Sequence, residues 1–412
     1  MGGEPSLESG LMKIKYPLHS VLCMSLILWP FWTHGAQSYK VDGGTSQEIT
    51  EHGVCREVIN TLAHDLFVPT HTAGEWSSFY NNPPTGVAVA ACPNDWYNSS
   101  WDYRVKITID HTKVGDNLTN FPVLITESHM PGSFWTNVQA TGADIVVTSN
   151  DGQTKLDREL VSINTSSPAM ELHVRVPTLL GGSPTILFLY YGNASASESN
   201  SASTWSAYRN VYHMGQTTPI DSTGTTATNN VSGGTITAGK MGNGLSFSGS
   251  GRIDFASNIT NANFKSLSFW YYPRSRGGGN FGSVFGSSDY NNGVRHVGED
   301  PLSIRRGGSI LVRTTGTFNV WKHIVMSYDS GTGQVTLYEN GTAVAPVAMS
   351  NWYTLQHLVA ISNDAARAPD GILDEMRIKN AVFPPTWPMT EYNNQDSPGT
   401  FYAVGDEIPK PL

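Results

Sequence analysis

The chain has 412 residues, a formal net charge of −9 and 14% charged side chains. Soluble proteins average about 25% charged residues, so this composition excludes a coiled coil and a long charged disordered segment. Lys and Arg number 25 against 34 Asp and Glu, with no basic run, so no nucleic-acid partner is expected. The length predicts two or three domains, and the abundant Ser, Thr, Asn and Gly favour an all-β protein with many turns.

Residues 1–36 have the parts of a secretory signal peptide behind an unusual upstream extension. Lys13 and Lys15 precede an apolar stretch from Val21 to Trp32, and small residues follow it. The stretch of about 12 residues is shorter than the ~20 that span a bilayer, so no transmembrane span is expected after cleavage. We expect a secreted or cell-surface protein, with an uncleaved anchor or a buried apolar segment as alternatives.

Residues 37–97 are expected to form a small separate module. Cys55 and Cys92 remain once the signal peptide, which contains Cys23, has been removed. An even pair of cysteines in an oxidising compartment predicts a disulfide, and a closed loop of about 37 residues would contribute roughly 3–4 kcal/mol. Such a bond would compensate for the small core of a module of this size. Two free buried thiols are the alternative.

Residues 98–205 show the period-two pattern of strands that bury one face. Apolar side chains recur at every second position of 105–109, 121–125 and 172–176, and they alternate with polar ones in the first and third segments. The third segment carries a polar face opposite its apolar one, made by Glu171, His173 and Arg175. Several short strands with turns between them predict a β-sandwich.

Two dipeptides predict tight hairpins: Asp151-Gly152, between two strand-like segments, and Asn340-Gly341, after the strand-like segment 335–339. The polar, low-complexity segment 193–206 is expected to be a linker or a long exposed loop. A second all-β unit is expected over residues 206–412. No helical pattern of ten or more residues is found after the signal peptide.

The segments between residues 101 and 193 resemble, in order, a bacterial family of unknown function. These segments are WDYRVKITID, FPVLI, ADIVVTSNDGQTKLDREL, ELHVRVP and TILFLYYGN. Members of that family are often found beside laminin-G-like domains in exported proteins. This resemblance implies an architecture but no chemistry.

The second unit resembles the laminin-G-like, concanavalin A-like jelly roll. The matching segments include GKMGNGLSFSGSGRIDF, LSFWYYP, WKHIVMSYD, VTLYENGT and GILDEMRIKNAVFPPTWPMTEYNNQ. The resemblance implies two antiparallel sheets, with loops that in many relatives hold a sugar or a calcium ion. The predicted fold class is therefore all-β, with two β-sandwich (jelly-roll) domains in tandem after the small disulfide-stapled module.

Asp374 is the first candidate for a cation site. Strict alternation over residues 372–378 would place it on one face with Ile372 and Met376, and an unpaired carboxylate on an apolar face is costly. Calcium accepts carboxylate oxygens, so Asp374 and Asp221 are predicted calcium ligands. The alternative is a structural Asp that accepts backbone N–H groups.

Sugar binding requires an aromatic platform and planar polar groups at a loop edge. In the second unit the candidates are Tyr290, Asn291, Arg295, Trp352 and Tyr353. In the first unit they are Trp101, Asp144 and Tyr191. Core aromatics or turn-forming residues are the alternative interpretation of each.

Enzyme signatures fail wherever they can be tested. No Glu is followed two residues later by Asp, so the E-x-D-x-x-E pattern of glucanases is missing, as are G-x-S-x-G and H-E-x-x-H. Asp157 and Glu159 share a strand face and could in principle serve a glycosidase.

The best hypothesis is a secreted, non-enzymatic binding protein that recognises a glycan or another cell-surface polymer, with calcium as its expected cofactor. A structural subunit of a surface fibre, pilus or phage-like tail, capable of self-assembly, is the alternative. A glycoside hydrolase is the second alternative.

Overall fold

The computed structural model describes residues 96–411 other than 261, 263–264, 298–299, 345 and 361–362, together with the backbone of some strands nearer the N-terminus. Those strands form an antiparallel sheet in the order β1 (Ala36–Val41), β2 (Thr45–Thr50), β3 (Cys55–Asn60), β4 (Val87–Ala90). The predicted signal peptide and the predicted Cys55–Cys92 disulfide lie outside the described residues and side chains. Trp96–Lys410 forms one compact unit, described by itself below.

The first sandwich consists of two antiparallel sheets around one apolar core. The sheets have the strand orders β27-β5-β10-β7 and β6-β9-β8. Its strands, short 3-10 helices (η) and helix are β5 (Tyr103–Ile109), η1 (His111–Lys113), β6 (Leu118–Ile125), α2 (Gly132–Asn137), β7 (Val146–Thr148), β8 (Arg158–Asn164), β9 (Ala169–Leu179), β10 (Thr185–Tyr191), η2 (Ala202–Trp205) and β27 (Tyr402–Pro409). The apolar positions of 105–109, 121–125 and 172–176 are buried in its core, as the alternation predicted.

The second sandwich has sheets in the orders β13-β14-β26-β16-β21-β22-β23 and β12-β15-β25-β17-β18-β19-β20, with β11 paired to β26 and β24 to β22. Its elements are β11 (Asn210–Tyr212), β12 (Thr228–Ser232), β13 (Thr235–Ala238), β14 (Asn243–Ser248), β15 (Arg252–Ile259), β16 (Ser266–Ser275), η4 (Gly278–Asn280), β17 (Ser283–Gly286), β18 (Gly293–Val297), β19 (Asp300–Arg306), β20 (Ser309–Arg313), β21 (Lys322–Asp329), β22 (Gln334–Glu339), β23 (Thr342–Ala343), β24 (Val347–Ala348), β25 (Leu355–Val359), η5 (Ala365–Arg367) and β26 (Asp370–Lys379). Together the two sandwiches confirm the predicted all-β class.

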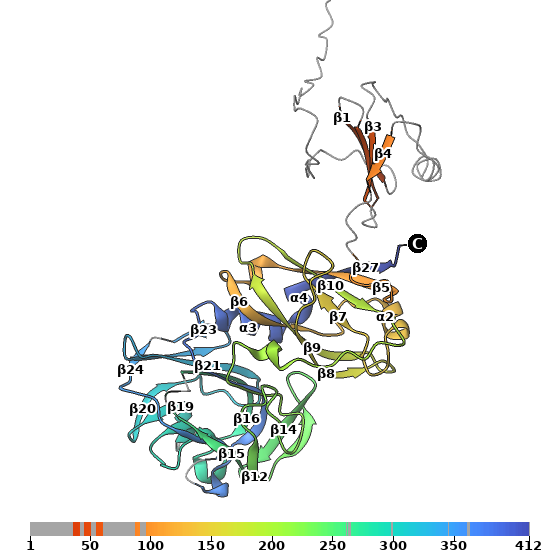
Figure 1. Cartoon of the computed structure of the whole chain (residues 1–412). Helices are drawn as coiled ribbons and strands as arrows, with labels where there is room; N and C mark the ends of the chain where they lie inside the picture. Colours follow the sequence, from red (N-terminus) through yellow and green to blue (C-terminus); the bar gives the residue numbers. More distant parts are fainter. Residues whose placement is uncertain are drawn as a thin grey trace, which may run out of the picture. The chain divides into compact units, whose positions relative to one another are not determined.

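The C-terminal segment ties the two sandwiches together. After β26 the chain forms α3 (Trp387–Asp396) and α4 (Pro398–Phe401) and then β27, which pairs with β5 of the first sandwich. Figure 1 shows these dark-blue elements among the orange and yellow strands of the first sandwich. The boundary predicted at 205/206 remains a prediction, and the structure adds that residues 206–412 supply strands to both sandwiches.

The polar outer face of the β6-β9-β8 sheet is covered by the second sandwich. Leu124 of β6, Met241 and Trp270 of β16 form one small apolar cluster across the junction. The Asn394 side chain of α3 accepts from the Leu124 N–H at 2.7 Å and donates to its carbonyl at 3.0 Å. Polar groups on β9 are therefore shielded from water.

Among the described residues, no helix is long and apolar enough to cross a membrane.

The Asp151-Gly152 turn closes a short hairpin, as predicted. Thr148 and Lys155 form an antiparallel bridge, and the Ser149 and Leu156 N–H groups donate to the Thr154 and Val147 carbonyls. Beyond this hairpin the two strands separate, because β7 pairs with β10 and β8 pairs with β9. The Asp151 carboxylate accepts backbone N–H groups of Gln153 and Thr154, which stabilises the turn. The second predicted hairpin is confirmed, since β22 pairs with β23 around Asn340-Gly341, both with positive φ.

The helix α3 has ten residues, although the sequence contains no helical pattern of that length. Its buried residues include Thr390, Glu391, Asn394 and Gln395, so its packed face is largely polar. An apolar stripe at helical spacing, the signal by which a helix is recognised in a sequence, is therefore not present in it.

The segment 193–206 is a loop that hydrogen bonds hold against the first sandwich. The side chain of Asn200 accepts from the Leu160 N–H at 2.8 Å and donates to the Leu160 carbonyl at 3.0 Å. The Glu198 N–H also donates to the Ala143 carbonyl at 2.8 Å. Of the two alternatives for this segment, the structure therefore favours the exposed loop.

The strand β26 departs from strict alternation at Glu375. The pairing with β16 advances by two residues on β16, from Ser268 to Trp270, and by three on β26, which marks a bulge. Glu375 has φ +47°. Met376 is packed in the core of the second sandwich, whereas the Asp374 carboxylate contacts Met241 at the junction. The expectation that Asp374 and Met376 share one face is therefore wrong.

Candidate binding site between the two sandwiches

A cavity of about 580 Å³ lies where the two sandwiches meet. It is lined by β8 and β9 of the first sandwich and by loops that follow β11 and β13 of the second. The polar side chains on its wall include Glu159, Asn164, Glu171, Asn200, His213 and Asn243. Carboxylates, amides and an imidazole thus converge on one open space.

Strand register explains how the polar groups come together. Glu171 and His173 are two residues apart on β9 and share its outer face, and Glu159 of β8 lies opposite His173 in the ladder. His213 follows β11 directly, and β11 pairs with β26 beside the bulge at Glu375. Both sandwiches therefore contribute to the same group of side chains.

We call Glu171, His173, His213 and Glu375 the His–Glu cluster. One ligand-type atom of each lies within 4.8 Å of all the others. Glu171 Oε1 is 3.3 Å from His173 Nε2 and 3.4 Å from His213 Nδ1, and Glu375 Oε2 is 3.8 Å from His173 Nε2. His213 Nδ1 is also directly hydrogen-bonded to Glu375.

Glu159 contacts Nε2 of His213, the ring nitrogen that does not contact Glu375. Its Oε2 lies 3.2 Å from His213 Nε2, and its Oε1 accepts a hydrogen bond from the Ser222 hydroxyl at 2.9 Å. The indole N–H of Trp205 also donates to this carboxylate. The imidazole of His213 is therefore positioned between two carboxylates on opposite ring nitrogens.

A second set of buried charges continues from the cluster into the interface. Arg377 donates to Glu375 and, at 2.7 Å, to Glu391 of α3. His323 Nε2 lies 3.5 Å from the other oxygen of Glu391, and the Tyr208 hydroxyl donates to Glu391 at 3.2 Å. Buried groups of alternating charge thus connect β9, β26 and α3.

The charge states follow from these contacts. Burial alone would lower the pKa of His213, but the charges and hydrogen bonds of Glu375 and Glu159 outweigh it and raise that pKa well above its usual value. Burial would raise the pKa of Glu375, yet His213 and Arg377 hold it well below its usual value. In the structure as it stands, the cluster therefore contains an imidazolium and a carboxylate at neutral pH.

Gly242 allows Glu171 to lie between two cavities. A second cavity of about 200 Å³ adjoins the first, and both are lined by Glu171 and Gly242. Gly242 has φ +49°, and a Cβ atom there would be 2.9 Å from Glu171 Oε2. A larger residue would shift the carboxylate, and the positive φ favours glycine at this position.

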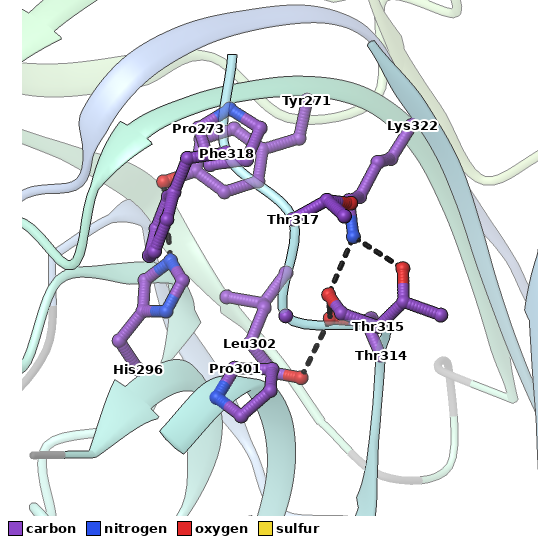
Figure 2. Close-up of a pocket in the computed structure, with 11 residues that line it drawn as sticks. Tyr271, Pro273, His296, Pro301, Leu302, Thr314, Thr315, Thr317, Phe318 and Lys322 are labelled. Carbon is purple, nitrogen blue, oxygen red and sulfur yellow. Dashed lines mark hydrogen bonds between the residues drawn. The ribbon is translucent and has the colours of Figure 1, made fainter. Parts of the chain in front are cut away.

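A small cavity inside the second sandwich has no room for a sugar. Figure 2 shows it between Tyr271, His296, Phe318 and the Lys322 side chain, with the Lys322 amine donating to Thr315. Its volume is about 10 Å³, roughly the least that admits one water molecule.

The sugar candidates of the first sandwich are buried and have structural partners. The Trp101 indole N–H donates to the Asp144 carbonyl at 2.6 Å. The Asp144 carboxylate accepts backbone N–H groups of Gln139 at 3.0 Å and Gly192 at 2.8 Å. The Tyr191 hydroxyl donates to Glu407 of β27 at 2.5 Å. In this conformation none of these three predicted side chains offers a face to a ligand.

Trp352 and Tyr353 are packed in the core of the second sandwich. Trp352 is 1% exposed, and its indole N–H donates to the Lys265 carbonyl at 3.0 Å. Tyr353 packs edge-on against it, with ring centroids 5.5 Å apart. These placements match the alternative interpretation of core aromatics.

Tyr290, Asn291 and Arg295 belong to a patch on the second sandwich, away from the cavity. Tyr290 is 41% exposed, and the Arg367 guanidinium lies 5.5 Å from its ring centroid. Asn291 accepts from the Gly308 N–H through its backbone carbonyl. Burial, together with Arg305 and Arg367, lowers the pKa of Arg295 to about 10. Arg295 is buried, and Arg367 pairs with Asp364 at 3.2 Å, so this Tyr290 patch exposes an aromatic ring beside an ion pair.

The two predicted calcium ligands each accept several hydrogen bonds. Asp374 accepts backbone N–H groups of Lys240 at 2.8 Å, Met241 at 2.9 Å and Glu375 at 2.9 Å. Asp221 accepts the N–H groups of Val211, Thr223, Thr225 and Thr226 and the amide of Asn210. Such donors satisfy a carboxylate without a cation, and calcium binding by this pair remains a prediction.

Two members of the His–Glu cluster, Glu171 and His173, stand out in the sequence only as the polar face of a strand. Such a face is ordinarily solvated. His213 and Glu375 are at least 40 and more than 200 residues away from them and meet them only in the folded chain. The burial of Glu171, His173 and Glu375, with His213 half-buried at the cavity wall, is the feature that distinguishes the cluster.

Solved structures match part of the chain at low similarity. Domain 4 of a Geobacillus stearothermophilus extracellular arabinanase, solved with arabinotriose, is 19% identical, with a TM-score of 0.34, over 45% of this chain and 98% of that one. The binding domain of Paraclostridial Mosquitocidal Protein 1 is 16% identical, with a TM-score of 0.37, over 45% of this chain. The binding domain of botulinum neurotoxin serotype G is 13% identical, with a TM-score of 0.32, over 45%. This chain covers 52% and 50% of the two toxin domains, and no ligand is inferred from these scores.

None of the curated proteins compared with the chain matches it in sequence. The resemblance of residues 101–193 to a family of unknown function therefore remains a prediction. Residues 247–387 match the family model Laminin_G_3, described as the concanavalin A-like lectin/glucanases superfamily. That span lies within the second sandwich, so the second sandwich contains the laminin-G-like, concanavalin A-like segment that the sequence predicted.

Proposed function

We propose that this chain is an extracellular carbohydrate-binding protein and that its ligand occupies the cavity between the sandwiches. The cavity itself carries the proposal, because its volume of about 580 Å³ suits a small ligand or one end of a longer polymer. Its carboxylates accept hydrogen bonds, and its amides both donate and accept, as the hydroxyl groups of a sugar require. The lectin and glucanase description of the family matching 247–387 supports the same ligand class.

The charge of the cavity favours a neutral glycan. Glu159 and Glu171 lie on its wall, and Glu159 retains a pKa below its usual value because His213 outweighs the effect of burial. An acidic sugar would meet two carboxylates against the one imidazolium of His213 in a partly desolvated space, which is unfavourable.

Affinity electrophoresis on neutral polysaccharides tests the proposal. Gln216 and Asn243 line the cavity and make no side-chain hydrogen bond within the described residues, so alanine substitutions there should leave the fold intact. Losing two sugar hydrogen bonds, at about 0.5–1.5 kcal/mol each, should weaken binding roughly 10-fold. Tyr290→Ala is the matched control and should bind as wild type.

Three outcomes would contradict this function or its location. Binding that survives both cavity substitutions but disappears in Tyr290→Ala would place the sugar on the Tyr290 patch. Release of reducing ends from a bound polysaccharide would favour the hydrolase alternative. Filaments of purified protein in electron micrographs, without any glycan retention, would favour the fibre-subunit alternative.

A further inference from the structure

We propose that the His–Glu cluster is a binding site for a divalent transition metal such as Zn²⁺, at the floor of the inter-sandwich cavity. Two imidazole nitrogens and two carboxylates are a donor set typical of zinc and related ions. The inference concerns the floor of the cavity and goes beyond the proposed function.

The spacing of the donor atoms suits one ion. At metal–ligand distances of about 2.0–2.2 Å, donors at the corners of a tetrahedron lie roughly 3.3–3.6 Å apart. Glu171 Oε1 is 3.3 Å from His173 Nε2 and 3.4 Å from His213 Nδ1. Glu375 Oε2 is 3.8 Å from His173 Nε2, so small side-chain adjustments would suffice.

The surroundings have the arrangement that supports metal ligands. A metal-bound histidine typically donates its other ring N–H to a carboxylate, which fixes its tautomer and orientation. His213 directs Nδ1 into the cluster and Nε2 towards Glu159, at 3.2 Å. An ion bound to Nδ1 would displace the proton of the imidazolium from this nitrogen, and the N–H at Nε2 would remain paired with Glu159. Arg377 donates a hydrogen bond to Glu375, so the orientation of this carboxylate is also fixed.

His173 presents one ring nitrogen to the cluster. Its side chain is fully buried, and its ion-pair contacts to Glu171 and Glu375 both run through Nε2. Nδ1 has no hydrogen-bond partner in the described structure, so the acceptor that orients the ring of His213 has no counterpart at His173. The ring of His173 is instead packed against Trp205, with centroids 4.9 Å apart, which keeps Nε2 directed at the cluster.

An entry path and a charge imbalance complete the argument. Glu171 and His213 line the cavity of about 580 Å³, so an ion can reach the cluster from solvent. The permanent positive charge beside the cluster is Arg377, which is shared between Glu375 and Glu391. A divalent ion would supply the additional positive charge that the buried carboxylates favour.

Cobalt substitution tests this site directly. Full-length protein without a polyhistidine tag is treated with a chelator and titrated with Co²⁺, whose visible absorption is intense in a tetrahedral site. We expect one equivalent to give this band, Zn²⁺ to abolish it by displacement, and either metal to raise the melting temperature by several degrees. Glu171→Gln and His173→Gln should lose the band and most of this shift.

A control variant separates the cluster from casual metal binding. His111→Gln removes a histidine from η1, outside the cluster, and should retain the full band. The melting temperature of each metal-free variant reports whether a lost band reflects a lost fold. Glu171 faces the cavity, which makes Glu171→Gln the variant expected to fold.

Two results would overturn the inference: no tetrahedral Co²⁺ band in wild type, or an equal band in the folded Glu171→Gln and His173→Gln variants. Stabilisation by Ca²⁺ alone, lost in Asp374→Asn, would point instead to the predicted pair Asp221 and Asp374. Glycan binding is measured separately, so metal binding without glycan retention would leave this inference intact.

Discussion

Replacing Arg377 by Met is the most demanding test of the buried charge network. The guanidinium is 1% exposed, donates to Glu375 and to Glu391, and lies 4.9 Å from the Trp205 ring centroid. Met fills much of the same volume but leaves two buried carboxylates without this partner. Removing one partner of a buried ion pair typically costs about 3–5 kcal/mol. For a unit of this size each kcal/mol lowers the melting temperature by roughly 2–4 °C, so we expect a decrease of about 10 °C.

The assay is reversible denaturant unfolding, supported by thermal melting. Lys410→Met is the matched control, because it breaks the exposed pair with Asp102 and should cost less than about 0.5 kcal/mol. Adding Glu375→Gln and Glu391→Gln to Arg377→Met removes the stranded charges and should recover most of the lost stability. A loss below about 1 kcal/mol for Arg377→Met would refute the view that this network is buried and tightly coupled.

Further predictions concern the C-terminal segment, one buried lysine and one glycine. A chain that ends at Asp396 loses β27 and exposes β5 as an edge strand, so its melting temperature should fall by several degrees, whereas a chain that ends at Pro409 should melt as the full chain. Burial lowers the pKa of Lys379 to about 8, with Glu391 opposing this, so the unfolded state binds more protons between about pH 8 and 10.5. Wild type should therefore gain up to about 3 kcal/mol relative to Lys379→Met across that window, and an unchanged difference in denaturant unfolding would contradict the burial of the amine. Gly242→Ala should cost more than 1 kcal/mol by urea unfolding, since φ +49° and the Glu171 contact both oppose a Cβ atom, and a stabilising effect would show that this approach is loose.

The sandwiches were predictable because period-two alternation reports burial on one face. Val105, Ile107 and Ile109 occupy the core as their spacing indicated. The same alternation rule failed at Glu375. One extra residue in β26 there changes which of the residues beyond it face the core. A bulge depends on the pairing with β16, which the sequence of β26 alone does not encode.

The site was less predictable than the fold, for a physical reason. Residue type identifies Trp352 and Trp101 as possible sugar platforms, but burial, which depends on distant segments, decides whether they can act as such. Glu171 and His173 were recognised as polar-face residues. Nothing local shows that this face meets a second sandwich, because that contact depends on α3 and β27 returning to the first sandwich.

Hydrogen–deuterium exchange of the full chain, with and without a neutral oligosaccharide that it retains, tests the central claim most directly. A ligand in the cavity should slow exchange in β8, in residues 213–222 and at Gly242 and Asn243. Protection confined to residues 286–296, around the Tyr290 patch, would contradict the assignment of the binding site to the junction of the two sandwiches.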